Sequence, residues 1–372
     1  TSALDVTVQK SILDLLKQIQ QQRNLTVIFI SHDIGVLAEI SDKLLVLYKG
    51  QLIETGTVSQ IINNPQHPYT KGLMACRPTL EMEQKKLPTV QDFIEDKTLS
   101  EKLIVSTVDK TKTVLEVKDL SVTYSLKRNL FGKTVESFQA VKDVSFKVYK
   151  GETLGLVGES GCGKTTLGRT LIQLIKAGEG KISFNGQPVN NLTRNQENDF
   201  RKRVQLIFQD PYASLNPRML IGEAILEVMH VHHIGKTKKE RKEKTMKLLR
   251  QVGLDNSFFS RYPHELSGGQ RQRIVIARAF ALEPEFIICD ESVSALDVSV
   301  QSQILNLLND LKQQLGLTYI FISHDLSVVK YMSDRIMVMK AGKLVEINET
   351  NQIYLNPQQN YTKKLLAAIP KI

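Results

Sequence analysis

A glycine-rich loop at residues 158–166 is the stretch whose residue types most clearly indicate chemistry. It follows the apolar run Leu154–Val157 and precedes Leu167–Ile172, which has helical character. Glycines let backbone N–H groups turn inward around a phosphate that would clash with a Cβ atom, and a helix N-terminus adds partial positive charge. The spacing predicts a phosphate-binding loop. The residues expected at the phosphates are Gly158, Ser160, Gly161, Gly163, Lys164, Thr165 and Thr166.

Two side chains of this loop have separate expected roles. Lys164 would reach the terminal phosphates as a point charge, and the Thr165 hydroxyl would take one coordination position of Mg²⁺. Glycine-rich turns before helices are common, so the rest of the chain has to decide between a nucleotide site and an ordinary turn.

Two adjacent carboxylates follow the apolar run Phe286–Cys289 further along the chain. A buried strand would bring Asp290 and Glu291 to its carboxyl end, where Asp290 can bind Mg²⁺ and Glu291 can polarise a water molecule. A general base contributes a factor of about 10² to 10⁴ in rate. This pair therefore predicts a hydrolytic function.

An amide and an imidazole follow two other predicted strands. Gln209 ends the run Leu206–Gln209 and can bind Mg²⁺ and the attacking water, while His324 follows Leu317–Ser323 and can hydrogen-bond the terminal phosphate. Taken alone, an isolated glutamine or a strand-end histidine is more often structural. Their order with the loop and the carboxylates favours the catalytic interpretation.

A second candidate anion site opens a predicted helix at Leu266–Arg273. A serine and two glycines at a helix start present backbone N–H groups to a negatively charged ligand. The stretch Ser294–Asp297 follows the two carboxylates and adds a further candidate aspartate. The candidates in these stretches are Ser267, Gly268, Gly269, Gln270 and Asp297.

The composition sets broad limits on the class of protein. With 372 residues the chain is long enough for about two domains, and its net charge of +10 suits nucleic acid, an anionic membrane or phosphate ligands without selecting among them. The richest basic run, Lys236–Lys247, is interrupted by glutamates and predicts a solvated helix face. The three cysteines lack metal-ligand spacing, which is typical of a reducing compartment. We expect neither a secretory signal nor a membrane span, which needs roughly 20 apolar residues.

A long internal repeat organises the chain. Each second copy lies 292 positions after the first. A period of this length indicates a duplicated domain and not a solenoid. The matching pairs include Ser2–Val6 with Ser294–Val298, Phe29–Asp33 with Phe321–Asp325, and Tyr69–Thr70 with Tyr361–Thr362.

The repeat predicts the domain boundaries. Residues 1–77 correspond to the last third of one domain, residues 78–113 form an interdomain linker, and residues 114–372 form a complete second copy. On this interpretation the chain starts within its first domain. The elements expected before the second copy are a helix at Gln9–Gln22, strands at Thr26–Ser31, Lys43–Tyr48 and Gln51–Glu54, and a packed apolar segment at Val90–Ile94.

The second copy alternates between strand and helix patterns. Strands are predicted at 114–117, 120–124, 144–148 and 181–184, residues 193–285 are mainly helical, and strands and helices alternate again from 286. We expect an α/β P-loop NTPase core with an antiparallel β subdomain and an inserted helical subdomain, preceded by a partial copy of the same domain.

The order of these stretches resembles the ATP-binding subunit of ABC transporters, which has a RecA-like core. The resemblance assigns residues 158–166 to the Walker A loop, Gln209 to the Q-loop, Leu266–Gln270 to the LSGGQ stretch, residues 286–291 to Walker B and the catalytic glutamate, Ser294–Asp297 to the D-loop, and His324 to the switch histidine. Tyr124 stands where the family stacks an aromatic ring on adenine, and Phe131 and Phe138 are alternatives. Residues 1–77 hold only Asp5 and His32 of this set.

Two further stretches are similar to the importers of oligopeptides, dipeptides, glutathione and nickel. They are Phe208–Arg218 and Asn64–Thr70. Some proteins of that branch fuse both ATPase domains in one chain. The chain departs from the pattern at Gln359–Asn360, where the first copy has His67–Pro68, and at Ser292–Val293, where the family usually has Pro-Thr.

The resemblance implies ATP and Mg²⁺ as ligands and ATP hydrolysis coupled to solute uptake. It further implies a second ABC ATPase domain that closes the site, and integral membrane permeases as partners at the cytoplasmic face of the inner membrane. The alternative is a soluble tandem ABC ATPase acting on ribosomes or nucleic acid, which the positive charge would suit. The importer-like stretches and the modest linker argue against it, and we expect no nucleic-acid partner.

Overall fold

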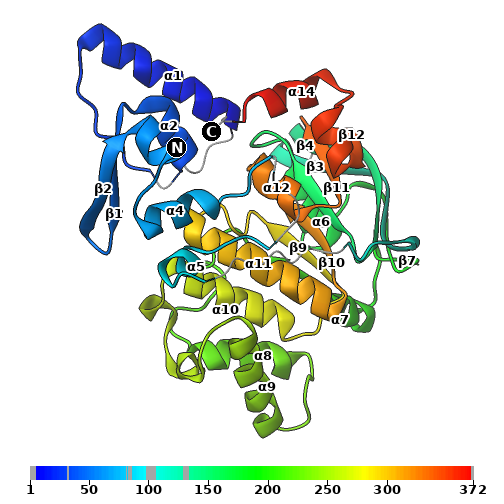
Figure 1. Cartoon of the computed structure of the whole chain (residues 1–372). Coiled ribbons are helices and arrows are strands. Elements are labelled where there is room, and N and C mark those ends of the chain that lie inside the picture. Colours follow the sequence, from blue (N-terminus) through cyan, green and yellow to red (C-terminus); the bar gives the residue numbers. More distant parts are fainter. Residues whose placement is uncertain are drawn as a thin grey trace.

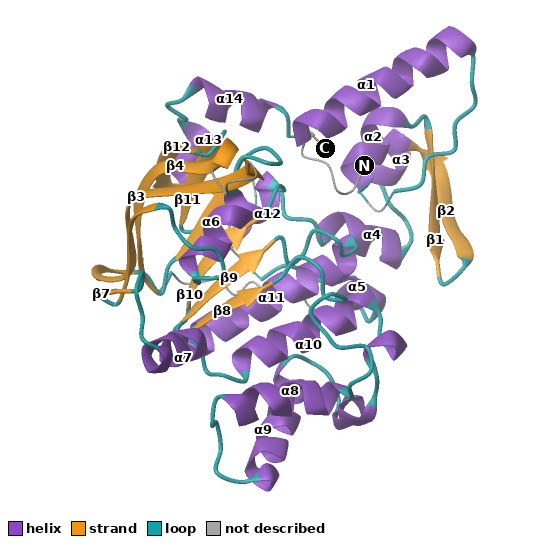
Figure 2. Cartoon of the chain, turned by 180° about the vertical axis from the view of Figure 1, so that it is seen from behind, coloured by secondary structure: helices purple, strands orange, loops and turns teal. Residues whose placement is uncertain are grey.

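The computed structural model describes residues 6–31, 33–80, 82, 86–97, 106–128 and 134–369. A large α/β body formed by the later residues lies beside a smaller N-terminal unit, and both views show the two side by side (Figures 1 and 2). In these residues, no helix is both long and apolar enough to cross a bilayer.

The central sheet of the large body has six strands in the described residues, in the order β12-β11-β5-β10-β9-β8. The five from β11 to β8 run parallel, and β12 pairs antiparallel at the edge. Strands β5, β9 and β10 are buried along their whole length, as their continuous apolar sequences require. The bounds are β5 Thr153–Val157, β8 Val204–Ile207, β9 Phe286–Asp290, β10 Thr318–Ile322, β11 Arg335–Lys340 and β12 Lys343–Glu349.

The parallel arrangement brings the ends of four strands to one edge of the sheet. The glycine-rich loop follows β5, and Gln209, Glu291 and His324 come shortly after β8, β9 and β10. Because parallel strands present their carboxyl ends together, the candidate residues meet at this edge.

An antiparallel sheet in the order β4-β3-β6-β7 forms the β subdomain. The strand β3 begins at Asp109, so the boundary predicted at residue 114 falls inside it, and the two short strands predicted at 114–117 and 120–124 are one strand. Its long pairing with β4 tolerates several register shifts. The bounds are β3 Asp109–Arg128, β4 Thr134–Lys150, β6 Glu179–Phe184 and β7 Gln187–Pro188.

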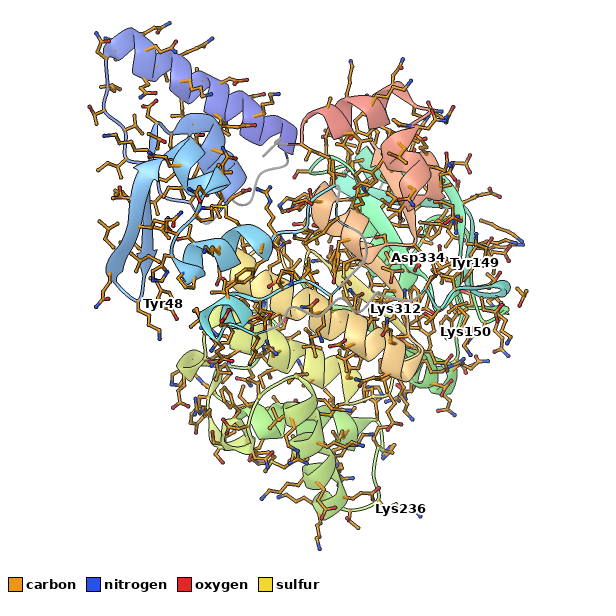
Figure 3. All side chains as sticks on the ribbon, viewed as in Figure 1. Tyr48, Tyr149, Lys150, Lys236, Lys312 and Asp334 are labelled. Carbon is orange, nitrogen blue, oxygen red and sulfur yellow. The ribbon has the colours of Figure 1, made fainter. Side chains whose placement is uncertain are left out.

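Helices cover the central sheet and form the helical subdomain, in which α8 and α9 lie at the end of the molecule away from the N-terminal unit (Figures 1 and 2). Lys236 marks the outer part of this subdomain (Figure 3). Exposed Lys238, Lys239 and Lys242 confirm the predicted solvated basic face. The bounds are α6 Lys164–Leu171, α7 Arg194–Arg203, α8 Ile221–Val231, α9 Lys238–Gln251, η1 Asn256–Ser260, η2 Pro263–Glu265, α10 Gly268–Phe280, α11 Val298–Leu315, α12 Leu326–Met332, α13 Thr350–Leu355 and α14 Asn360–Ala367.

The N-terminal unit confirms the predicted helix and hairpin. The hairpin turns at Lys49–Gly50, where both residues have positive φ. The predicted motif residues Asp5 and His32 lie outside the described residues. The bounds are α1 Val6–Arg23, α2 Ile34–Ile40, β1 Lys43–Tyr48, β2 Gln51–Thr57, α3 Val58–Asn63 and α4 Pro68–Ala75.

The strand predicted at Thr26–Ser31 is wrong. Residues 25–31 are all described and form no strand, and Ile28 and Ile30 are 88% and 92% exposed. The repeat partners of these two residues, Ile320 and Ile322, are 0% exposed in β10, which hydrogen-bonds to β5 on one edge and to β9 on the other. The same sequence pattern therefore forms a strand only where neighbouring strands satisfy its backbone groups and cover its side chains.

Equivalent residues near the end of each repeat copy make equivalent hydrogen bonds. The Glu54 carboxylate accepts from the backbone N–H groups of Gln66 (2.7 Å) and His67 (3.1 Å). Glu346, its repeat partner, accepts from the N–H groups of Gln358 (2.9 Å) and Gln359 (3.2 Å). The departure at Gln359–Asn360 leaves this contact intact, because backbone atoms donate the bonds.

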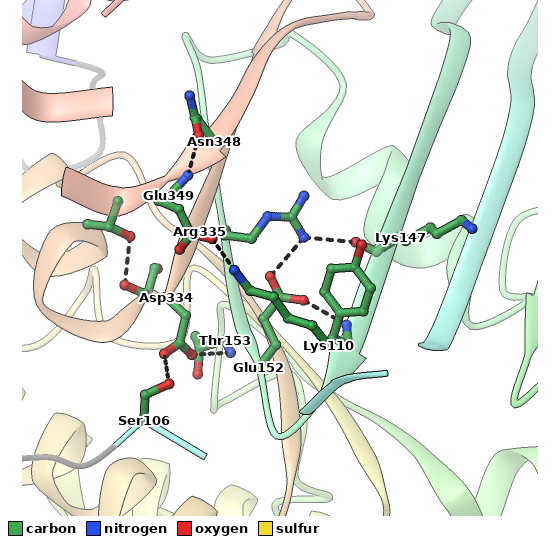
Figure 4. A network of polar contacts seen from close by, with 12 residues as sticks. Ser106, Lys110, Lys147, Glu152, Thr153, Asp334, Arg335, Asn348 and Glu349 are labelled. Atoms are coloured by element: carbon green, nitrogen blue, oxygen red, sulfur yellow. Dashed lines mark hydrogen bonds and ion pairs between the residues drawn. The ribbon is translucent and has the colours of Figure 1, made fainter. Parts of the chain in front are cut away.

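The segment predicted as a linker contacts both the N-terminal unit and the large body in its described parts. Val90–Ile94, predicted to pack on a domain surface, forms helix α5, and Val90 is buried with Cys76 after α4 and with Val298 of α11. Further along, Ser106 Oγ donates to Asp334 Oδ1 (2.9 Å) and Lys110 Nζ donates to Glu349 Oε1 (2.7 Å), as Figure 4 shows. The same network holds buried Glu152 against Arg335, and burial raises the pKa of Glu152.

Candidate nucleotide-binding and catalytic site

The glycines of the loop are required by its backbone geometry. A Cβ on Gly158 would lie 2.2 Å from the Met339 carbonyl oxygen, and one on Gly163 would lie 2.3 Å from that of Ala140. Both residues have positive φ, as does Gly161, whose Cβ would meet nothing within 4 Å. The loop is therefore packed tightly from one side and open at Gly161, which leaves space for a ligand.

Lys164 is buried at the start of α6 and turns its ammonium group back into the loop. Its Nζ donates to the carbonyl oxygens of Gly158 (2.7 Å) and Glu159 (3.0 Å). A buried cation beside an open cradle and the first turn of a helix fits an anionic phosphate group. Ser160 lies in the turn of the loop, and Thr166 lies in the first turn of α6.

The candidate adenine-stacking ring is near the loop. Tyr124 Oη lies 3.5 Å from Thr166 Oγ1, and the Tyr124 side chain is 38% exposed. Phe138 pairs with Tyr124 across β3 and β4 and is 51% exposed, so both rings are accessible to a ligand. The third candidate, Phe131, lies outside the described residues.

The two predicted Mg²⁺ ligands of the loop and the β9 strand are in contact. Thr165 Oγ1 donates to Asp290 Oδ1 at 3.0 Å, and Asp290 is only 2% exposed. Burial raises the pKa of Asp290, and among the described residues no cationic side chain makes a salt bridge with it. A buried carboxylate in contact with a hydroxyl fits a divalent metal ion, which would supply positive charge at this position.

The other three predicted catalytic residues converge on one carboxylate oxygen. Glu291 Oε2 accepts from Gln209 Nε2 at 3.1 Å and lies 3.4 Å from His324 Nδ1. Glu291 has a φ of 47°, and its N–H donates to the Ile322 carbonyl at 3.0 Å, which turns the residue at the end of β9.

The electrostatics of this cluster favour an ionised base. The hydrogen bond from His324 lowers the pKa of Glu291, and the same contact raises the pKa of His324. Glu291 is therefore a carboxylate at neutral pH and can accept a proton from water.

The second candidate anion site is built as predicted but lies apart from this cluster. Ser267 caps α10 in a capping box with Gln270. Gly268 is exposed, whereas a Cβ on Gly269 would lie 2.3 Å from Val300 Cγ1, so this glycine serves the packing of α10 on α11. Asp297 caps α11 through the Val300 N–H at 3.0 Å. The contacts described for these residues are with α10 and α11 and not with the glycine-rich loop.

Comparison with known proteins accounts for this arrangement. The family model of the ABC transporter matches residues 141–294. Residues 141–294 are thus similar to the nucleotide-binding part of ABC transporters. A second family model, the C-terminal region of oligopeptide/dipeptide transporters, matches residues 53–97 and 345–372. The first match begins in the first copy of the repeat and continues into the segment predicted as a linker, and the second lies in the second copy.

Curated relatives match the whole of the chain. The glutathione import ATP-binding proteins GsiA of Salmonella typhimurium (strain LT2) and of Escherichia coli O157:H7 are 47% identical over 374 and 387 residues. Both alignments cover 100% of this chain and 60% of the relative. The chain thus spans 60% of the length of these relatives.

Solved structures confirm the predicted ABC ATPase fold. The dimeric post-hydrolysis structure of the ATP-binding cassette MJ0796 bound to ADP and Pi has a TM-score of 0.57 at 27% identity, covering 63% of this chain and 98% of that one. The structure of cbiO1 from Clostridium perfringens, part of the ABC transporter complex cbiONQ, has a TM-score of 0.56 at 25% identity, covering 66% and 92%.

The structure adds a loop contact that sequence reasoning missed. Tyr361 on α14 accepts a hydrogen bond from the Glu159 N–H in the glycine-rich loop at 3.2 Å. The repeat pairs Tyr361 with Tyr69 and could have drawn attention to this residue. The repeat does not show which residue Tyr361 contacts.

Proposed function

We propose that this chain hydrolyses ATP as a subunit of an ABC importer that takes up peptides or related small solutes. The observation that carries the proposal is the convergence of Gln209, Glu291 and His324 beside the Lys164 loop. The importer branch is supported by the two matches to the oligopeptide/dipeptide transporter C-terminal region and by the GsiA relatives.

Each residue of the cluster has a role that its position supports. Lys164 and the loop N–H groups bind the phosphates, and an exposed ring on β3 or β4 contacts the base. Glu291 removes a proton from the attacking water, while Gln209 and His324 hold that water and the terminal phosphate. Thr165, Asp290 and Gln209 would hold Mg²⁺, which supplies positive charge at the phosphate oxygens when bound.

A second ABC ATPase domain completes the site in this proposal. Ser267, Gly268 and Gln270 open α10 with backbone N–H groups that suit an anion, and Asp297 caps the neighbouring α11. None of the contacts described for these residues is with the glycine-rich loop of the same domain. We infer that they close on ATP held by another domain. The dimeric post-hydrolysis structure of the ATP-binding cassette MJ0796, bound to ADP and Pi, supports this arrangement.

We further propose that the chain carries parts of two fused ATPase domains. Residues 1–77 belong to the first, the second begins with β3 at Asp109 and not at the predicted residue 114, and residues 78–108 link the two. The equivalent contacts of Glu54 and Glu346 and the start of a family match in each copy support a duplicated domain. Permease subunits would then dock the protein at the cytoplasmic face of the inner membrane.

The test compares two variants of the purified chain. Glu291→Gln should bind Mg-ATP with unchanged affinity and lose hydrolysis by about 10² to 10⁴. Lys164→Ala should weaken binding itself, because it removes the cation from the cradle. Hydrolysis by Glu291→Gln at the wild-type rate would contradict the assigned base. Co-purification with ribosomes, and not with membrane permeases, would contradict the transport function.

A further inference from the structure

Tyr361 brings the C-terminal region of the chain into contact with the glycine-rich loop. Its hydroxyl accepts a hydrogen bond from the Glu159 N–H at 3.2 Å, and its ring lies under Lys340 Nζ at 4.7 Å from the centroid. The residue belongs to α14, within the segment that matches the transporter C-terminal region.

This contact is one step away from the phosphate-binding lysine. The peptide unit that joins Gly158 to Glu159 donates its N–H to Tyr361 and accepts Lys164 Nζ on its carbonyl oxygen at 2.7 Å. Lys164 Nζ also donates to the Glu159 carbonyl at 3.0 Å. Hydrogen bonds that share one peptide unit polarise each other, so the Tyr361 contact strengthens the bond to Lys164 and fixes the plane of that peptide.

The tail is anchored by contacts that do not use the Tyr361 hydroxyl. Glu346 on β12 accepts from the N–H groups of Gln358 and Gln359 and from Thr362 Oγ1. Thr362 and Leu365 are the buried residues of α14, whereas Tyr361 is only partly buried. The hydroxyl can therefore be removed without releasing the helix.

We propose that Tyr361 is a positioning residue for nucleotide binding, which holds the Gly158–Glu159 peptide in the orientation that places Lys164. The C-terminal region thereby controls the phosphate loop of its own domain. The part of this inference that concerns ATP rests on the proposed function, whereas the contact itself does not.

The decisive variant is Tyr361→Phe, which keeps the ring and removes the acceptor. Without nucleotide, hydrogen exchange of the Glu159 amide should become about fivefold faster, the factor that corresponds to one ordinary hydrogen bond. The dissociation constant for Mg-ATP should rise by about the same factor, because the loop must be ordered on binding.

The matched control is Tyr354→Phe. This residue also lies in the C-terminal region, and its hydroxyl donates to the Leu326 carbonyl, away from the glycine-rich loop. The control should lower the melting temperature while leaving Glu159 exchange and Mg-ATP affinity unchanged. It separates a general loosening of the C-terminal region from the specific loss of the loop contact.

The measurements test the Tyr361–Glu159 hydrogen bond and the proposed nucleotide binding separately. Unchanged Glu159 exchange in Tyr361→Phe, or equal acceleration in Tyr354→Phe, would overturn the inference. Faster exchange with unchanged Mg-ATP affinity would overturn the positioning role. If the wild-type chain bound no Mg-ATP, the proposed function would fail, while the exchange measurement would still establish or refute the contact.

Discussion

The residues of the catalytic cluster modify each other's protonation. Glu291 and His324 are both largely buried, and their contact favours the carboxylate on one side and the imidazolium on the other. Gln209 donates to the same carboxylate oxygen. This arrangement keeps the Glu291 carboxylate ionised and oriented, which would reduce the reorganisation needed in the proposed hydrolysis.

The pair predicts a pH-dependent contribution to stability. Since the pKa of His324 is raised above 6.5, its contribution is fully present below that pH and is lost as the pH rises through the raised pKa. Since the pKa of Glu291 is lowered from 4.5, its contribution is present above that pH and is lost as the pH falls through the lowered value. The stability lost in His324→Gln should therefore be larger at about pH 6 than at about pH 9.

Denaturant unfolding of wild type and variant at both pH values measures this difference. His264→Gln, at an exposed histidine, is the control and should show the same small effect at both. An equal loss at the two pH values for His324→Gln would contradict the described pair.

The burial of Asp290 predicts how the melting temperature responds to Mg-ATP. Asp290 is 2% exposed, and burial raises its pKa, so the ionised group costs stability when no cation is bound. Asp290→Asn should raise the melting temperature of the nucleotide-free chain and lose the further increase that Mg-ATP gives to wild type. Glu291→Gln is the matched comparison, because it should keep that increase. An Asp290→Asn chain still stabilised by Mg-ATP as strongly as wild type would show that Asp290 does not hold the ion.

Among the elements, the segment predicted as a linker has a defined place on the large α/β body. Leu87 is 2% exposed, and its backbone pairs with the Asn306 side chain, which accepts from the Leu87 N–H (3.0 Å) and donates to its carbonyl (2.8 Å). Tyr331 donates to the same Asn306 oxygen at 3.2 Å. The linker thus contacts α11, which begins after Asp297, and α12, which follows His324.

This contact predicts unequal effects of two neighbouring substitutions. Asn306→Ala should lower the free energy of unfolding by about 1–3 kcal/mol, because it leaves buried backbone groups of Leu87 without partners. Lys86→Ala should cost at most about 1 kcal/mol, since its salt bridge with Asp310 is exposed. Chemical denaturation gives both values, and hydrogen exchange over residues 86–94 should increase only in Asn306→Ala. Equal effects of the two changes would exclude this anchoring.

For the molecule as a whole, the separation of the two halves of the nucleotide site matters most. The glycine-rich loop and the start of α10 belong to one domain but have no described contact with each other. On the proposed function, the loop and the start of α10 would each contribute half of a nucleotide site, and another domain would supply the second half.

This separation predicts hydrolysis that depends on protein concentration. If two chains must associate, the activity per chain should rise with concentration until the dimer dominates. Mixing Lys164→Ala, which keeps the α10 site, with Ser267→Arg, which keeps the loop, should restore activity that neither variant shows alone. ATPase assays over a concentration series measure both effects. Specific activity independent of concentration, with no recovery on mixing, would show that one chain suffices.

An element of the fold was predictable where residues within a short stretch of sequence are sufficient to stabilise it. The β1–β2 hairpin, the buried β9 strand and the Ser267 cap depend on local turn residues, apolar runs and capping chemistry. The strand predicted at Thr26–Ser31 failed because an apolar run becomes a parallel strand only when neighbours lie on its edges. Similarly, the merging of two short strands into β3 depends on its pairing with β4.

The sequence by itself determined which chemical groups form the candidate site. The type and the short spacing of these residues were sufficient to select them. A lysine and threonine after glycines, or two carboxylates after an apolar strand, need no distant information to be recognised. Only the tertiary structure decided that Glu291 receives Gln209 and His324, and that Tyr361 contacts Glu159. These contacts join residues far apart in the chain, and only the packing of the parallel strands and of α14 brings such residues within hydrogen-bond distance.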